Sequence, residues 1–295
     1  MKNDIKGIIL AGGTGSRLFP ITEGVSKQIL PVYDKPMIYY PLSVLMEANI
    51  KDILIITTKE DQAGFKRLLG DGSKFGINLS YVIQPSPDGL AQAFILGEEF
   101  INNNPCAMIL GDNIFYGNNL GRKLKNASSD ANDGYATIFG YKVRDPKRFG
   151  IMEVDSEGNV LSVEEKPENP KSDYAITGLY FYPNNVSKMA KLVKPSKRNE
   201  LEITSLNDLY LKKCKLKSNL LDDSYTWFDT GTFDSLIDAS NMIRTIENNK
   251  DSLVCSPELI AFNNRWITDK ELENRSDLLS KNEYGKRLKK VINKK

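Results

Sequence analysis

A glycine-rich loop near the start of the chain is the first feature that could do chemistry. It reads Ala-Gly-Gly-Thr-Gly-Ser-Arg over residues 11–17 and follows a short apolar run. Glycines let a ligand approach the backbone, and successive exposed N–H groups form an anion site that an arginine fork can complete. We therefore predict that Gly12, Gly13, Thr14, Gly15 and Arg17 bind phosphate. From the loop alone, a plain tight turn remains the alternative.

The loop matches neither of two standard nucleotide-binding motifs. A P-loop ends in Gly-Lys-Ser/Thr, whereas Ser16-Arg17-Leu18 stands here. A dinucleotide-binding loop needs a third glycine at the position that Leu18 occupies. The mismatches argue against a P-loop enzyme and leave a nicotinamide-dependent oxidoreductase as a distant alternative.

Two aspartates are candidate metal ligands. Asp112 comes just after an apolar run that ends at Leu110, and Asp229 precedes a helical pattern. A residue at the carboxyl end of a strand faces the ligand crevice, and Mg²⁺ commonly uses one or two carboxylates beside substrate phosphates. The structural alternatives are a turn at Asp112 and a helix cap near Asp229, with Thr230 or Thr232 as the more typical capping residue.

The composition restricts the chemistry further. The 295 residues include no histidine, which excludes Ser-His-Asp catalysis and a His-ligated zinc site. The net charge of +2 gives no global basic field, so we expect no nucleic-acid partner. The apolar run over residues 5–11 is too short for a signal peptide or a membrane span, so we expect a cytoplasmic protein without a membrane partner.

The elements that must position these residues alternate between strands and helices in the first half of the chain. We predict strands at residues 5–10, 52–57, 79–83 and 106–110, and helices at residues 39–48, 60–69 and 90–100. Near-continuous apolar strands separated by helices predict a parallel sheet that is covered on both faces. Such a sheet binds ligands at the carboxyl ends of its strands.

The second half is richer in strands and turns. We predict strands at residues 135–141, 151–154, 160–165 and 178–182, with a hairpin turn at residues 155–159. Helices are predicted at residues 203–214, 232–248, 268–279 and 284–292. The expected organisation is a mixed α/β catalytic domain over residues 1–250 and a small helical C-terminal appendage over residues 251–295.

Several motifs in the same order resemble the sugar nucleotidyltransferase family. The family signature is a Gly-rich loop ending in Arg-Leu, followed by Lys-Gln/Pro-Leu-Pro-Val, and it matches residues 10–18 and 26–32 and continues to residue 42. Residues 84–93, 200–204 and 227–232 are typical of the branch that transfers a thymidylyl group to glucose 1-phosphate. The resemblance covers nearly the whole chain, from about residue 5 to residue 292.

This resemblance implies a fold, a reaction and an assembly. The fold is a Rossmann-like, three-layer α/β architecture of the nucleotidyltransferase type, with a mixed sheet and additional strands. The substrates are dTTP and glucose 1-phosphate, the cofactor is Mg²⁺, and the enzyme is a homotetramer that a deoxysugar nucleotide inhibits allosterically. Uridylyl or cytidylyl transfer to a sugar 1-phosphate remains the sister alternative.

The resemblance also assigns roles to individual residues. The catalytic positions are Arg17, Lys27, Asp112, Lys166 and Asp229, of which Asp112 and Asp229 bind Mg²⁺. The nucleotide-binding positions are Leu10, Gly12, Gly13, Thr14, Gly15, Gln28, Gln84 and Gly89, and the sugar-binding positions are Phe149, Gly150, Glu165, Ile176 and Glu200. Two departures concern the sugar: Phe149 stands where close relatives often carry Tyr, and Ser205 where Asp is common. We expect the Phe149 ring to pack without the contact of a hydroxyl group.

Overall fold

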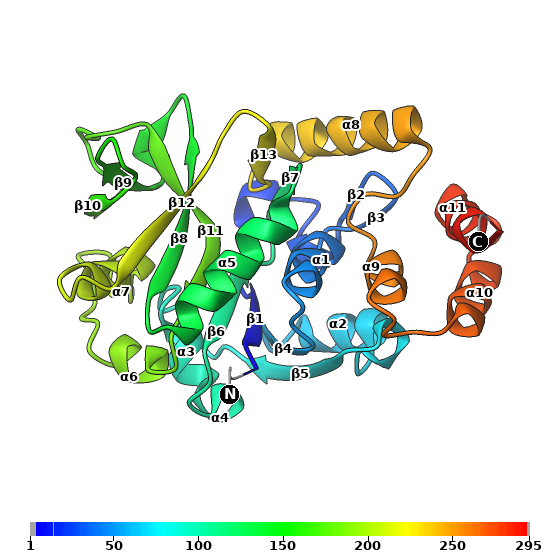
Figure 1. Ribbon diagram of the computed structural model, residues 1–295, viewed down its shortest axis with the longest axis horizontal. Coiled ribbons are helices and arrows are strands. Elements are labelled where there is room, and N and C mark those ends of the chain that lie inside the picture. Colours follow the sequence, from blue (N-terminus) through cyan, green and yellow to red (C-terminus); the bar gives the residue numbers. More distant parts are fainter. Residues whose placement is uncertain (1–3, 14, 294–295) are drawn as a thin grey trace.

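A layered α/β arrangement positions the candidate residues (Figure 1). The computed structural model describes residues 4–13 and 15–293, so Thr14 of the predicted phosphate loop lies outside the described residues. Within these residues, a mixed sheet of nine strands has a hydrophobic core on each face. The expected three-layer α/β fold is therefore confirmed.

The first half of the chain builds the parallel part of this sheet. Strand β1 (Lys6–Ala11) pairs in parallel with β4 (Asp52–Thr57) and β6 (Cys106–Leu110), and β4 pairs in parallel with β5 (Asn78–Ile83). Leu10 lies opposite Leu110 in the β1–β6 pair. The chain therefore leaves both strands at the same edge, which brings the glycine-rich loop and Asp112 together.

The second half adds strands of mixed direction. Strand β11 (Tyr174–Tyr182) runs antiparallel to both β6 and β8 (Ala136–Lys142), and β12 (Leu216–Leu221) pairs in parallel with β8. Strands β9 (Gly150–Val154) and β10 (Val160–Glu165) form the predicted hairpin, in which the Asp155 N–H donates to the Asn159 carbonyl at 3.0 Å. The sheet order is β10-β9-β11-β6-β1-β4-β5, with β8 and β12 branching from β11.

Helices cover the two faces of the sheet. Consecutive strand residues point to opposite faces, so that Ile8 and Ile9 of β1 belong to different hydrophobic clusters. On the Ile9 side lie α1 (Tyr39–Glu47), α2 (Gln62–Leu69) and α5 (Leu120–Asn132). On the Ile8 side lie α3 (Gln92–Leu96), α4 (Glu98–Ile101), α6 (Val186–Ala190) and α7 (Ile203–Leu211).

The single helix predicted over residues 90–100 is wrong. The chain forms α3 and α4, which are separated at Gly97. A Cβ atom at Gly97 would lie 3.0 Å from the Ala93 carbonyl oxygen and 3.1 Å from Cδ1 of Ile8. A side chain at this position would crowd its own helical turn and Ile8 of β1, and the regular helix is interrupted at this glycine.

Two small sheets lie at the edge where the parallel strands end. Strand β7 (Asn113–Gly117) pairs with β13 (Tyr225–Asp229), and β2 (Pro31–Val32) pairs with β3 (Lys35–Pro36). Helix α8 (Phe233–Lys250) follows β13, and its N-cap is Thr232, whose side chain accepts a hydrogen bond from the Ser235 N–H. Because Thr232 caps the helix, Asp229 is not needed for capping.

The C-terminal part is helical, as predicted. It contains α9 (Pro257–Asn263), α10 (Asp269–Leu278) and α11 (Glu283–Asn293), of which only α9 was not predicted (Figure 1). Phe262, Leu272 and Leu288 are buried in the same hydrophobic cluster as α1 and α2. Across residues 4–13 and 15–293, every helix is too short or too polar to cross a bilayer.

Candidate active site

Two cavities share Arg17 at the edge where β1 and β6 end. The smaller measures about 200 Å³ and the larger about 530 Å³. The predicted residues that line the smaller cavity are Gly13, Gly15, Arg17 and Lys27. Those that line the larger cavity are Arg17, Asp112, Phe149, Gly150, Glu165, Lys166, Ile176, Glu200 and Asp229. The structure thus brings together the predicted phosphate-binding, metal-binding and sugar-binding residues.

Asp112 stands two residues beyond the end of β6 and lines the larger cavity, whereas its partner Lys27 lines the smaller one. Its carboxylate accepts hydrogen bonds from the Lys27 ammonium and, at 3.0 Å, from the Asn113 side-chain amide. Burial alone would raise the pKa of Asp112, but the positive charge of Lys27 and these hydrogen bonds outweigh it and lower the pKa. Asp112 is therefore ionised at neutral pH.

Asp229 is the second carboxylate of the site. It is the last residue of β13 and lies opposite Asn113 of β7, which puts it beside Asp112. Burial and the negative charge of Asp112 raise the pKa of Asp229, although Lys27, Arg17 and Arg148 act in the opposite direction. Among the described residues, no hydrogen bond or ion pair to the Asp229 carboxylate is found.

Thr230 fixes the distance between the two aspartates. Its backbone N–H and its side-chain hydroxyl both donate to the Asp112 carbonyl oxygen, at 3.1 Å and 2.6 Å. The residue is fully buried, and its hydroxyl also contacts the Met37 sulfur at 3.2 Å. The segments that carry Asp112 and Asp229 are therefore tied by backbone geometry, independently of their charges.

These two carboxylates suit a hard divalent cation. The Asp112 and Asp229 carboxylates lie side by side, and that of Asp229 has no protein partner among the described residues. Two adjacent negative charges repel each other unless a cation or a proton separates them. The oxygen donors match the preference of Mg²⁺, which needs few protein carboxylates when substrate phosphates supply further oxygens. The residues present therefore fit the predicted magnesium site.

Arg17 lies against the chain that follows Asp229. A Cβ atom added to Gly231 would lie 2.5 Å from Nη2 of Arg17, so only glycine leaves room for the guanidinium. Gly15 has a φ of 61° before the short 3-10 turn Ser16–Leu18, which turns Arg17 into the cavities. The Thr22 hydroxyl donates to the Gly15 carbonyl at 2.8 Å and closes this loop.

Gln84 lies beside the glycine-rich loop and is oriented by two further side chains. Its Nε2 donates to Oε1 of Gln92 at 2.7 Å, and Nε2 of Gln92 donates to Asp88 at 2.7 Å. The carboxylate can only accept, so the relay directs Oε1 of Gln84 toward Gly12, where an added Cβ atom would lie 2.1 Å away. The relay also ends next to Gly89, which links three predicted nucleotide-binding positions.

The sugar-binding positions cluster at the far end of the larger cavity. The Thr204 hydroxyl donates to Oε2 of Glu165 at the end of β10. A Cβ atom at Gly150 would lie 3.0 Å from that hydroxyl and 3.3 Å from Oε2 of Glu165, so glycine keeps the cavity open there. Lys166 has a φ of 43°, which is uncommon for a non-glycine residue and often accompanies functional sites.

Phe149 packs against Trp227 rather than forming a polar contact. The ring centroids are 5.3 Å apart in an edge-to-face arrangement. The Trp227 indole N–H donates to Oδ1 of Asn113 at 2.6 Å, and the same oxygen accepts from the Gly178 N–H at 3.0 Å. Asn113 therefore holds β13 and β11 on either side of the cavity, a role that its Gly-Asp-Asn motif did not predict.

Arg148 and Arg198 are site residues that the sequence reasoning missed. Both line the larger cavity. The Arg198 guanidinium donates to Glu200 and lies within 3.5 Å of Glu202 and 3.9 Å of Glu165. Each arginine stands within two positions of a predicted sugar-binding residue, Phe149 or Glu200, and that proximity was the available signal.

Besides Gly12 and Gln84, three further predicted nucleotide-binding positions lie outside the walls of both cavities. The Leu10 carbonyl accepts from the Gly111 N–H at 2.9 Å, which joins β1 to the segment of Asp112. Gln28 is buried, and its side-chain oxygen accepts from the Ser26 hydroxyl at 2.7 Å. Gly89, with a φ of 106°, packs against the backbone of Leu201. In this conformation all three support the loops around the site.

Known proteins are similar to this chain in sequence and in fold. The family described as nucleotidyl transferase matches residues 6–246. A glucose-1-phosphate thymidylyltransferase from Neisseria gonorrhoeae is 56% identical over 290 residues, which are 98% of this chain and 100% of that protein.

Solved structures agree with this relationship. A Bacillus anthracis structure in complex with sucrose aligns with a TM-score of 0.75 at 42% identity, covering 81% of this chain and 95% of that one. A UDP-glucose pyrophosphorylase complexed with UDP-glucose aligns with a TM-score of 0.72 at 26% identity, covering 82% of this chain and 99% of that one. From its matched sequence, its fold and the site at the edge of its sheet, this chain belongs to the nucleotidyl transferase family.

Proposed function

We propose that this chain is a glucose-1-phosphate thymidylyltransferase, which transfers dTMP from dTTP to α-D-glucose 1-phosphate. The observation that carries the proposal is the pair of cavities that share Arg17, with Asp112 and Asp229 in the wall of the larger one. A reaction between two phosphate-bearing substrates needs two adjacent anion sites. The choice of substrates is supported by the 56% sequence identity with the thymidylyltransferase of Neisseria gonorrhoeae, which extends over the full length of that protein.

The reaction is an in-line displacement at phosphorus. A phosphate oxygen of glucose 1-phosphate forms a bond to the α-phosphorus of dTTP, while the bond from that phosphorus to the bridging oxygen of the β-phosphate breaks. Pyrophosphate leaves with the electron pair, and dTDP-glucose remains. A phosphate monoester has a second pKa of about 6, so the nucleophile is already ionised at neutral pH and no general base is required. A chain without histidine suits this chemistry.

Positioning and charge neutralisation supply the catalysis. The loop over residues 12–15 cradles the triphosphate, and Arg17 and Lys27 neutralise the charge of the departing pyrophosphate. Lys166 holds the phosphate of the sugar substrate, and Glu165 and Glu200 accept hydrogen bonds from sugar hydroxyls. The larger cavity contains both cationic and carboxylate side chains, as a phosphorylated sugar requires.

Asp112 and Asp229 would hold Mg²⁺ in the wall of the larger cavity. When bound, the ion neutralises phosphate oxygens that would otherwise repel each other. The Lys27 ammonium, which pairs with Asp112 in this structure, holds that carboxylate in the ionised form.

Gln84 reads the base in this proposal. Its amide can donate to O4 of thymine and accept from N3–H, a pattern that cytosine does not match. The relay through Gln92 and Asp88 fixes which end of the Gln84 amide faces the glycine-rich loop. The same hydrogen bonds would form with uracil, so Gln84 selects against cytosine.

We further propose a cytoplasmic homotetramer that a deoxysugar nucleotide inhibits allosterically. Residues 1–250 form the catalytic domain and residues 251–295 the helical appendage. These proposals rest on the resemblance of the motifs to the family. Inhibition by dTDP-rhamnose and the mass of the assembly in solution test them directly.

Product analysis tests the proposed reaction. The protein is mixed with dTTP, glucose 1-phosphate and Mg²⁺, and the nucleotide products and pyrophosphate are separated and quantified. We expect dTDP-glucose and pyrophosphate in equal amounts, with dTTP preferred over UTP and CTP. A strong preference for UTP would replace the thymidylyl assignment by uridylyl transfer, and no product with any triphosphate would refute transferase activity.

A further inference from the structure

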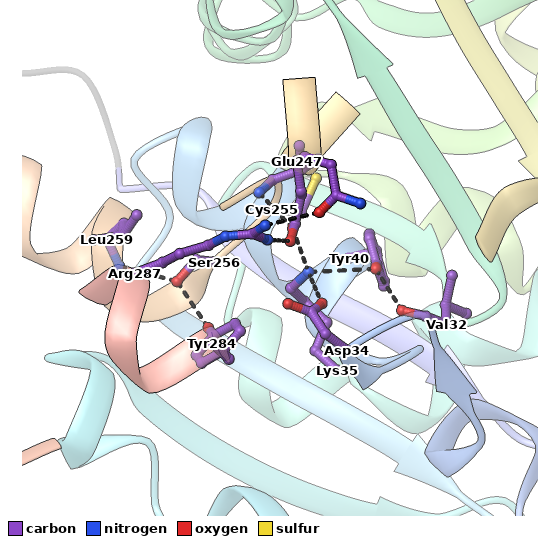
Figure 2. A network of polar contacts seen from close by, with 12 residues as sticks. Val32, Asp34, Lys35, Tyr40, Glu247, Cys255, Ser256, Leu259, Tyr284 and Arg287 are labelled. Atoms are coloured by element: carbon purple, nitrogen blue, oxygen red, sulfur yellow. Dashed lines mark hydrogen bonds and ion pairs between the residues drawn. The ribbon is translucent and has the colours of Figure 1, made fainter. Parts of the chain in front are cut away.

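A buried cluster of charged residues joins three parts of the molecule that are distant in sequence. Lys35 of β3, Glu247 in the last turn of α8 and Arg287 of α11 form its centre (Figure 2). Their side chains are 1%, 0% and 9% exposed. None of these residues lines either cavity of the site.

Glu247 is the residue that all parts of the cluster share. One carboxylate oxygen accepts from Lys35 Nζ at 2.9 Å and from the Val254 N–H at 2.9 Å. The other accepts from Nη1 of Arg287 at 2.7 Å, and Nη2 of Arg287 donates to Asn248 at 2.9 Å. Glu247 is thus bonded to the β2–β3 hairpin, to the chain after α8 and to α11.

The environment of Lys35 is built for a buried cation. Its ammonium also pairs with Asp34 and lies 5.1 Å from the centre of the Tyr40 ring and 5.6 Å from that of Tyr284. The Tyr40 hydroxyl donates to the Val32 carbonyl at 2.8 Å, which holds the opposite strand of the hairpin. Two cations and two carboxylates balance, so removing one member leaves an uncompensated buried charge.

The hairpin connects this cluster to the nucleotide side of the site. The Ile38 N–H donates to the Gln28 carbonyl at 2.8 Å, and the Met37 N–H donates to the Leu30 carbonyl at 2.9 Å. These bonds tie the end of the hairpin to the turn Lys27–Ile29, which carries Lys27. Met37 also contacts Thr230, which binds the backbone of Asp112.

Helix α8 makes the second connection. Its N-terminal cap, Thr232, stands three positions after Asp229, and Glu247 lies in its last turn. A helix transmits a displacement of one end to the other because its backbone hydrogen bonds keep it rigid. The cluster therefore holds the far end of the helix whose N-terminal cap stands three positions after Asp229.

We propose that the Lys35–Glu247–Arg287 cluster positions Lys27 and Asp229 for the nucleotide, so that α11 is required for dTTP use. Glu247 and Arg287 are positioning residues, because they act through the hairpin and α8 without contacting a substrate. The inference rests on the proposed function for its substrate, and it adds a role for the C-terminal helices in binding the triphosphate.

The test compares two buried glutamates in the full-length protein. Glu247→Gln removes one charge from the cluster, and Glu258→Gln removes one from a second buried pair, in which Arg275 Nε donates to Glu258 at 3.0 Å. Glu258 is also 0% exposed, and its carboxylate accepts from Arg275 of α10 and from the Tyr284 hydroxyl of α11. Among the described residues it makes no bond to the β2–β3 hairpin or to α8, the two elements through which the cluster is proposed to act. Steady-state kinetics with each substrate varied in turn are measured well below both unfolding temperatures.

The expected result is a change in one KM only. In Glu247→Gln, kcat/KM for dTTP falls on the order of 10-fold to 100-fold through a higher KM for dTTP, because small misplacements of catalytic groups have effects of this size. The KM for glucose 1-phosphate stays at the wild-type value. Glu258→Gln lowers the unfolding temperature and leaves both KM values unchanged. If the cluster had a purely structural role, both variants would show a lower active fraction with wild-type KM values. That result would overturn the proposal.

Arg287 provides the second pair of variants. Arg287→Met is expected to raise the KM for dTTP, and Arg287→Lys, which keeps the charge, is expected to restore much of the wild-type value. If Glu247→Gln does not fold, the two Arg287 variants still test the positioning role. Arg287 lies at the edge of the cluster, so its replacement disturbs the fold less. Equal kinetics in both Arg287 variants would contradict the proposal.

Nucleotide binding separates this inference from the proposed reaction. If the wild-type protein made no dTDP-glucose, the proposed function would fail, and calorimetry with dTTP and Mg²⁺ would still test the cluster. Weaker dTTP binding in Glu247→Gln than in Glu258→Gln supports the positioning role. Equal binding in the two variants would refute it.

Discussion

Lys27, in the wall of the smaller cavity, forms an ion pair with Asp112 in the wall of the larger one, although the two residues are 85 positions apart in sequence. The pair joins the turn that follows the glycine-rich loop to the end of β6. Because the Lys27 charge lowers the pKa of Asp112 while Asp229 has a raised pKa, the two neighbouring carboxylates are electrostatically different. Asp112 is thus the more acidic carboxyl group of the candidate metal site.

Replacing Asp112 by Asn is therefore expected to abolish most activity. The change removes a proposed ligand of Mg²⁺ and the partner of Lys27, and kcat should fall by at least about 100-fold. Pyrophosphate release measures the rate, and circular dichroism checks the fold. Asp222→Asn is the control, because Asp222 is exposed and bonds only within its turn to Ser224. Wild-type turnover in Asp112→Asn would refute the metal assignment.

Gly231→Ala is expected to weaken triphosphate binding without unfolding the protein. The added methyl group would lie 2.5 Å from Nη2 and 2.9 Å from Cζ of Arg17, so the flexible guanidinium must move. Since a hydrogen bond to a charged group contributes about 1.5–3 kcal/mol, the KM for dTTP should rise about tenfold or more.

Gly121→Ala is the matched control for this change. Apart from its chain neighbours and the backbone of its own helix, no described atom lies within 4 Å of a Cβ at Gly121 in α5, so alanine there is expected to stabilise the protein by about 0.5–1 kcal/mol. Kinetics and thermal unfolding are measured on both variants. An unchanged KM for dTTP in Gly231→Ala would show that Arg17 does not act on the triphosphate.

Gln92→Leu tests whether the relay orients the base-reading amide. Without its acceptor, Gln84 loses its fixed orientation, and the preference for dTTP over dCTP should fall about fivefold to tenfold, the equivalent of one net hydrogen bond of about 1 kcal/mol. Competition between the two triphosphates measures this preference. The double variant with Gln84→Ala should show no further loss beyond Gln84→Ala alone. Additive losses would mean that Gln92 acts independently of Gln84.

The raised pKa of the buried Glu47 carboxyl group predicts that folding stability depends on pH. Burial raises the pKa of this carboxyl, at the end of α1, from 4.5 to about 7. Between these two values the folded state binds more protons than the unfolded state, so the free energy of unfolding falls as the pH rises through this window. The loss amounts to about 3 kcal/mol and is complete above the folded-state pKa.

Urea unfolding from pH 4.5 to pH 8 checks the Glu47 prediction. Glu47→Gln should be more stable than the wild type above neutral pH and nearly equal to it at the acidic end. Glu99→Gln, at an exposed position of α4, is the control and should keep the wild-type slope. A wild-type slope in Glu47→Gln would show that another group causes the decline.

The parallel half of the sheet and the identity of the site residues could be predicted from sequence. The apolar runs at β4 and β6 have the predicted bounds because a strand buried on both faces must be continuously apolar. The glycine-rich loop, Asp112 and Asp229 were identified by residue type and motif. These features are local in sequence, and local patterns suffice to recognise them.

The tertiary structure alone decided how these residues meet. The two-stranded sheets β7–β13 and β2–β3 were not predicted from the sequence, yet they place Asp229 beside Asp112 and tie Lys35 to Glu247. Arg148 and Arg198 had no motif that marked them, and the interruption of the helix at Gly97 was not predicted. Contacts between residues distant in sequence depend on strand pairing and packing, which no local pattern encodes.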